Sequence, residues 1–248
     1  MSAQQLPDAG ALIGALVCCA VYASGRPLYQ HQMRRPRRWL SLAAGVSVAY
    51  VFVDLLPELN AQQQGFVRSA GPGLLFAEQR IYIAALIGFV FFYGLDHFVL
   101  AARPAGTPTA DREARGTVYW FHLGGYALYS WLIGYLLVER ATRGAVSLVL
   151  YGVAMALHLS TIAHGLVEKH ERRYDHGGWW ILAASLVAGW LAGVAAPLSA
   201  LTMSRFFAFV AGGVVMTSMN DELPRTGQGR FLWFLLGATA YAIILLLA

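Results

Sequence analysis

The segment Thr117 to Val138, TVYWFHLGGYALYSWLIGYLLV, runs for 22 residues without a charged side chain. A helix rises about 1.5 Å per residue, so this segment is long enough to cross the roughly 30 Å hydrocarbon core of a bilayer. Apolar segments of comparable length lie at about 10–25, 40–57, 81–101, 117–138, 146–167, 178–196, 199–219 and 231–248. We therefore predict an all-α, polytopic membrane protein with eight transmembrane helices, in which residues 1–248 form a single transmembrane domain.

The composition agrees with a membrane protein. Hydrophobic residues make up 58% of the chain and charged residues only 12%, and the mean hydropathy is +0.54, which is far from the balance of a soluble domain. The start, Met1 to Gly10, carries no Lys or Arg, so it lacks the basic region of a signal peptide and we expect the first helix to be retained. Cys18 and Cys19 are adjacent, which disfavours a disulfide and predicts ordinary packing.

The cations are distributed by loop. Of the 18 Lys and Arg residues, 13 lie in alternate loops, and the other five are Arg68, Arg80, Arg140, Arg143 and Arg205. Loops rich in Lys and Arg face the cytoplasm. We therefore predict a multi-pass protein of the cell membrane with both termini on the non-cytoplasmic side. The net charge of +5 follows from this topology, so we expect the lipid bilayer and no nucleic acid as a partner.

Two segments share a pattern, AAGVSVAYVFVDLLPEL (43–59) and VAGGVVMTSMNDELPR (210–225). The predicted topology places them in opposite orientations across the membrane. Inverted repeats of this kind build many secondary transporters. We predict a 3+2+3 inverted-repeat arrangement, with spans 117–138 and 146–167 as the central pair. Three positions match at a constant offset of 167 residues: Gly45 with Gly212, Asp54 with Asp221 and Pro57 with Pro224.

Three of the four histidines within these apolar segments are candidate ligands. His122 belongs to FHLGGY (121–126), His158 belongs to LHLSTI (157–162), and His164 follows in the same span. Ionisable residues are costly inside a membrane and usually mark a pathway or a cofactor. Neutral imidazole is a ligand for zinc, iron and copper, so we predict these three histidines as metal ligands. The alternative is that they only form hydrogen bonds between packed helices.

Five further residues are candidates for an ion pathway: Asp54, Asp96, Tyr126, Glu168 and Asp221. Glu168 follows His164 by four residues and shares its helix face, whereas Tyr126 lies on the polar side of the fourth span. Asp54 and Asp221 end their spans on opposite sides, so we predict them at the two mouths. Each also precedes a proline by three residues, so the alternative is that it only closes a helix end.

These features resemble the ZIP (Zrt/Irt-like) family of divalent-metal permeases. The resemblance rests on eight spans with outward termini, on VDLLPEL (53–59), on NDELP (220–224), and on His122 and His158 in the fourth and fifth spans. It implies a permease that moves zinc, iron or manganese into the cytoplasm, with no resident cofactor and with a homodimer as an open alternative.

This sequence lacks some of the metal ligands that the resemblance would imply. Typical members carry further polar ligands after each of these histidines, but here Leu123 and Leu159 follow directly, and Tyr126 and Ile162 stand at the carboxylate position. The resemblance therefore implies either a permease with a reduced ligand set or a fold relative that has lost metal transport or changed its substrate.

Motifs for other chemistry are missing from the sequence. It has no glycine-rich phosphate loop, no CxxC pair and no nucleophile elbow, so we expect neither an ATP-driven pump nor an enzyme. A haem b protein is the alternative from another class, because membrane histidines also ligate haem. Such sites pair histidines across a bundle, whereas His158 and His164 lie six residues apart on one helix.

Overall fold

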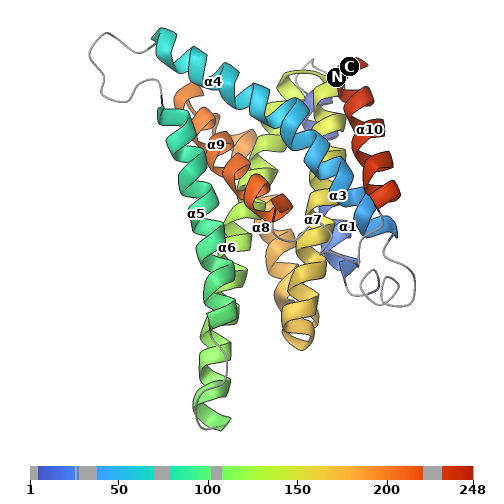
Figure 1. Cartoon of the computed structure of the whole chain (residues 1–248). Coiled ribbons are helices and arrows are strands. Elements are labelled where there is room, and N and C mark those ends of the chain that lie inside the picture. The colour runs from blue at the N-terminus through green and yellow to red at the C-terminus, as the bar shows by residue number, and fades with distance from the viewer. Residues whose placement is uncertain are drawn as a thin grey trace.

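The computed structural model describes residues 5–25, 27, 38–69, 79–101, 108–219 and 231–247. These residues contain helices and no strand, which confirms the all-α prediction (Figure 1). The helices are α1 (Gln5–Ala23), α3 (Arg38–Tyr50), η1 (Val51–Leu55), α4 (Leu56–Ser69), α5 (Arg80–Ala101), α6 (Pro108–Thr142), α7 (Ala145–Arg173), η2 (Tyr174–Gly178), α8 (Trp179–Ala195), α9 (Ala200–Thr217) and α10 (Phe231–Leu247).

Among the described residues, five helical segments are long and apolar enough to cross a membrane, as expected for a multi-pass membrane protein. They are Ser41–Arg68, Arg80–Phe98, Gly116–Thr142, Ala145–Glu168 and Ala200–Thr217. Three shorter helical segments are also apolar, namely Ala9–Ala23, Trp179–Ala195 and Phe231–Leu247. The two ends of the chain lie at the same end of the bundle (Figure 1).

The second predicted span does not end at Pro57, as the sequence suggested. The helix continues from α3 through the π-helical turn η1 into α4 and ends at Ser69. Proline has no N–H group and crowds the carbonyl four residues before it. In η1 the Leu56 N–H donates to the Val51 carbonyl, five residues back, and this wider turn accommodates the proline. Asp54 therefore lies inside a continuous helix and does not close its end.

The helices α6 and α7 extend beyond the predicted spans 117–138 and 146–167. They are joined by a tight turn at Gly144, whose φ of 121° belongs to a region that favours glycine. Of the apolar window in α6, 72% is buried inside the protein, against 28% in α5. The helix α6 is thus an interior helix, and its polar residues His122, Tyr126, Tyr129 and Ser130 are buried among other helices.

Three pairs of helices approach so closely that glycine is required at the contact. A Cβ atom added at any of these glycines would collide with a backbone carbonyl of the partner helix. The contacts are Gly45 with Phe234 and Gly237 with Leu42 between α3 and α10; Gly88 with Phe209 and Gly212 with Ala85 between α5 and α9; and Gly134 with Leu186 and Gly189 with Trp131 between α6 and α8. Such small-residue contacts let membrane helices gain van der Waals packing along their backbones.

Candidate functional site

Two of the candidate residues, Asp96 and His122, form a buried pair between α5 and α6. The Asp96 Oδ1 atom lies 3.1 Å from His122 Nε2, and the two side chains are 4% and 1% exposed. The ring of Tyr126, one turn further along α6, packs edge-on against the imidazole with centroids 5.0 Å apart. The sequence predicted all three residues separately, as a ligand and as pathway residues, and the structure brings them together.

His158 on α7 lies in a second buried polar group. Its Nε2 atom shares a hydrogen bond of 2.9 Å with the Tyr129 hydroxyl on α6, and the Thr217 hydroxyl on α9 lies 3.4 Å away. Thr217 also donates to the Gly213 carbonyl at 2.9 Å. This group ties three helices together. Sequence reasoning did not find the partners of His158, because they depend on the register between helices.

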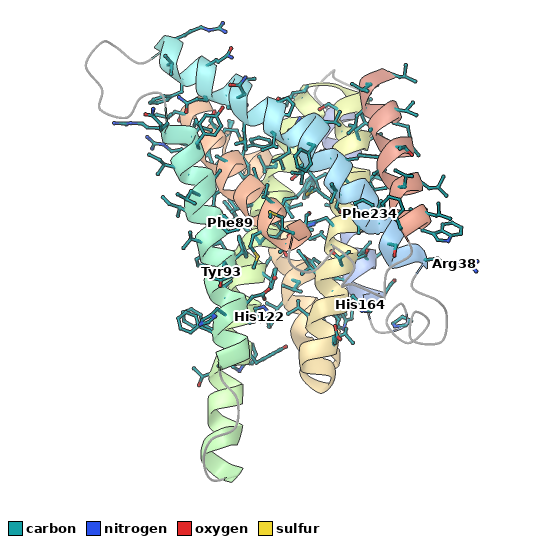
Figure 2. The ribbon with its side chains drawn as sticks, in the orientation of Figure 1. Arg38, Phe89, Tyr93, His122, His164 and Phe234 are labelled. Atoms are coloured by element: carbon teal, nitrogen blue, oxygen red, sulfur yellow. The ribbon has the colours of Figure 1, made fainter. Side chains whose placement is uncertain are left out.

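His164 and Glu168 follow one turn apart along α7. His164 is half-buried and Glu168 is exposed. Figure 2 shows His122 and His164 on α6 and α7, in the half of the bundle away from α4. Across the described part of the chain, no group of three or more His, Cys, Asp or Glu residues could hold a metal ion. The three predicted histidine ligands are therefore not gathered into one centre.

The two residues predicted at the mouths of the pathway are Asp221 and Asp54. Asp221 lies outside the described residues. Asp54 lies in η1 with its side chain 33% exposed, and its Oδ2 atom is 3.9 Å from the Arg140 Nη2 atom on α6. The sequence placed Arg140 just beyond the fourth span, as a loop residue, so the prediction missed its role as a partner of Asp54.

Arg140 is a buried cation, with its side chain 5% exposed. Its guanidinium carbon lies 5.5 Å from the centre of the Tyr151 ring on α7 and 5.2 Å from that of Phe207 on α9. A second carboxylate, Glu139, approaches to 4.0 Å. Cation–π contacts of this kind strengthen when they are removed from water, so the aromatic rings help to compensate the buried charge.

Arg143, at the turn between α6 and α7, makes shorter contacts than Arg140. It donates to Glu58 at 2.7 Å and to Glu139 at 2.6 Å, and Gln62 donates to the same Glu58 oxygen at 2.7 Å. Burial opposes the charge of Arg143, but the hydrogen bonds and charges of the two glutamates outweigh it and raise its pKa. Arg143 therefore stays charged and fixes this end of α6 to α4.

A scan of protein-family models gives no match to this chain, and neither does a search of curated proteins. Asp96 and His122 combine a carboxylate and an imidazole within one buried contact.

Proposed function

We propose that this protein is a ZIP-like permease of the cytoplasmic membrane that moves a divalent metal ion, zinc, iron or manganese, into the cytoplasm. In this proposal Asp96 and His122 are the first ligands of the transported ion. The observation that carries it is their separation of 3.1 Å in the buried interior of an apolar bundle. His158 and His164 are further ligands for the ion along α7. Asp54 lies near the mouth of the ion pathway at the α4 end of the bundle.

The geometry of the pair suits a divalent metal. Zinc binds imidazole nitrogen and carboxylate oxygen at about 2.0–2.2 Å, so two such donors around a tetrahedral ion lie about 3.3 Å apart. The observed Oδ1 to Nε2 separation of 3.1 Å needs only a small widening to admit the ion. Two protein ligands completed by water would hold it weakly, and a transport site must release its ion.

The glycine contacts support the proposed inverted repeat. Gly45 and Leu42 on α3 stand 167 residues before Gly212 and Phe209 on α9, and Gly88 and Ala85 on α5 stand 149 residues before Gly237 and Phe234 on α10. With these offsets, the contact of Gly45 with Phe234 corresponds to that of Gly212 with Ala85, and the contact of Gly237 with Leu42 corresponds to that of Gly88 with Phe209.

The packing of α3 on α10 thus recurs as the packing of α9 on α5, with the order of the two helices in the chain exchanged. This is what a 3+2+3 arrangement requires when the second helix of one repeat packs on the third helix of the other. The proposal therefore relates α3 to α9 and α5 to α10, with α6 and α7 as the central pair.

The proposal also takes α1, α8 and α10 as membrane spans, which makes eight. α8 and α10 have 17 residues each and contain no charged side chain, and a helix of that length spans about 25 Å. An even number of spans agrees with the two chain ends lying at one end of the bundle (Figure 1). From the cation distribution, we place that end on the non-cytoplasmic side.

A second candidate function is a fold relative that has lost metal transport or changed its substrate. It is favoured by the lack of any group of three metal-binding side chains among the described residues. It is also favoured by the ordinary hydrogen-bond partners of His158, which are Tyr129 and Thr217. Under this alternative the buried histidines hold packed helices together.

Metal uptake into proteoliposomes separates the two candidates. The purified protein is reconstituted, and entry of zinc, iron and manganese is followed with a trapped metal-sensitive dye. We expect saturable uptake that Asp96→Asn and His122→Ala abolish. His97→Ala is the matched control, because His97 neighbours Asp96 on α5 but is exposed and stacks on Tyr93. No uptake of any ion would favour the second candidate, and a Soret band in the purified protein would favour haem.

A further inference from the structure

One buried guanidinium connects four helices at the α4 end of the bundle. Arg140 extends from α6 and lies between Tyr151 of α7 and Phe207 of α9. Its third neighbour, Asp54, belongs to the π-turn in the helix formed by α3 and α4. Single π-turns inside α-helices are frequent at functional sites, and this one carries the carboxylate nearest to the buried cation.

The contacts that hold Arg140 in place include no hydrogen bond to a carboxylate. The nearest carboxylate oxygens lie at 3.9 and 4.0 Å, beyond hydrogen-bond distance. Within the described residues, its Nε and Nη2 atoms have no hydrogen-bond partner. Arg143, one turn further along the chain, instead forms hydrogen bonds of 2.6 and 2.7 Å. Arg140 is thus held by charge and aromatic contact, without the short, directional bonds that fix Arg143.

The neighbours of Arg140 come from the parts that transport would move. Asp54 and Phe207 belong to α3–η1 and α9, which the proposed repeat relates, whereas Arg140 and Tyr151 belong to the central pair. If the repeats rock against the central pair, Arg140 cannot keep all of these contacts. We propose that Arg140 is a latch whose contacts hold the α4 end of the bundle closed. The inference takes only the rocking motion of the repeats from the proposed function.

A nearby residue can report whether this end opens. Ser204 on α9 is 8% exposed, lies one turn before Phe207, and donates a hydrogen bond to Gln62 of α4. Separation of α4 from α9 would expose this position to water. A cysteine there is close in size to serine, and Cys18 and Cys19 are the only native thiols. Replacing both by alanine leaves a single reporter thiol.

The test measures how fast a membrane-impermeant thiol reagent modifies Ser204→Cys, in lipid nanodiscs and in metal-free buffer. We expect Arg140→Gln to accelerate modification about tenfold, which corresponds to about 1.4 kcal/mol in favour of the open state. Arg68→Gln is the matched control, because it removes the same charge from an exposed position on α4 and should leave the rate unchanged. Arg140→Lys, which keeps the charge but not the planar group, should give a smaller acceleration.

An unchanged rate in Arg140→Gln, in protein that remains monodisperse, would overturn the latch. If that variant does not fold, Arg140→Lys decides, and an unchanged rate there overturns the proposal equally. The labelling requires no metal transport. If Arg140→Gln accelerates labelling but the protein takes up no metal, the latch is kept and the permease is rejected. If the protein takes up metal but Arg140→Gln leaves labelling unchanged, the permease is kept and the latch is rejected.

Discussion

Asp96 and His122 stand 26 residues apart in the chain, yet their side chains meet at 3.1 Å between α5 and α6. Both are almost fully buried, so the cost of taking them out of water is offset by the contact that they make with each other. The pair places a carboxylate oxygen and an imidazole nitrogen side by side, and both are atoms that divalent metal ions accept as ligands.

The first prediction concerns metal binding in the purified protein. Zinc or manganese should raise the Tm of the detergent-solubilised wild type, because a ligand present at 100 times its Kd stabilises the folded state by about 2.7 kcal/mol. Asp96→Asn and His122→Ala should lose this shift, because each removes one ligand from the pair. Differential scanning fluorimetry with and without the ion measures it. His97→Ala should keep the full shift, and loss of the shift there as well would argue against a specific role for the pair.

The second prediction separates the His158 group from the Asp96–His122 pair. Tyr129→Phe removes the hydroxyl that lies 2.9 Å from His158 but keeps the ring that packs on Phe92. We expect a loss of about 0.5–1.5 kcal/mol in the free energy of unfolding, seen as a lower Tm, with the metal-induced shift intact. Tyr93→Phe, at an exposed ring on α5, should leave the Tm unchanged. If Tyr129→Phe abolished the metal shift, His158 would belong to the primary site.

The third prediction compares the two arginines at the α4 end. Arg143 is 34% exposed at the turn, so its pairs with Glu58 and Glu139 are screened by water and salt, and Arg143→Gln should cost about 1 kcal/mol or less. Arg140→Gln should lower the Tm by more, because it leaves Asp54 and the aromatic contacts without their buried cation. Thermal melts at low and high salt measure both. Only the Arg143 effect should shrink with salt, and equal losses at high salt would contradict the assignment of Arg140 as the buried charge.

The sequence was sufficient for the all-helical class of fold, and it singled out both residues of the buried Asp96–His122 contact. Long apolar segments predict helices because a bilayer satisfies no backbone hydrogen bonds, and a helix is found at each predicted range, although the second continues to Ser69 and α6 and α7 extend beyond theirs. His122 and Asp96 were both identified, because ionisable residues stand out in apolar segments. Their contact could not be predicted, since it depends on how α5 and α6 are rotated and shifted against each other.

Two other features of the structure could not be predicted from local sequence patterns. Pro57 predicted a helix end, but the π-turn of η1 admits the proline and the helix continues. Arg140 was assigned to a loop because of its charge, although Tyr151 and Phe207 enclose it in the bundle. In both cases tertiary packing outweighed the usual local preference, and tertiary packing is not encoded in the spacing of residues along one segment.

The fourth prediction tests the inverted repeat through its glycines. Gly45→Ala and Gly212→Ala each place a methyl group against a backbone carbonyl of the partner helix, and backbone cannot give way as a flexible side chain does. Each should cost about 1–3 kcal/mol, and the two losses of Tm should be similar, because the contacts correspond under the 167-residue offset. Gly124→Ala is the control, since its added Cβ meets no neighbour and alanine is preferred in helices by about 1 kcal/mol, so it should raise the Tm slightly. A tolerated Gly45→Ala beside a severe Gly212→Ala would mean that the two contacts are not equivalent, and the repeat would lose its main structural support.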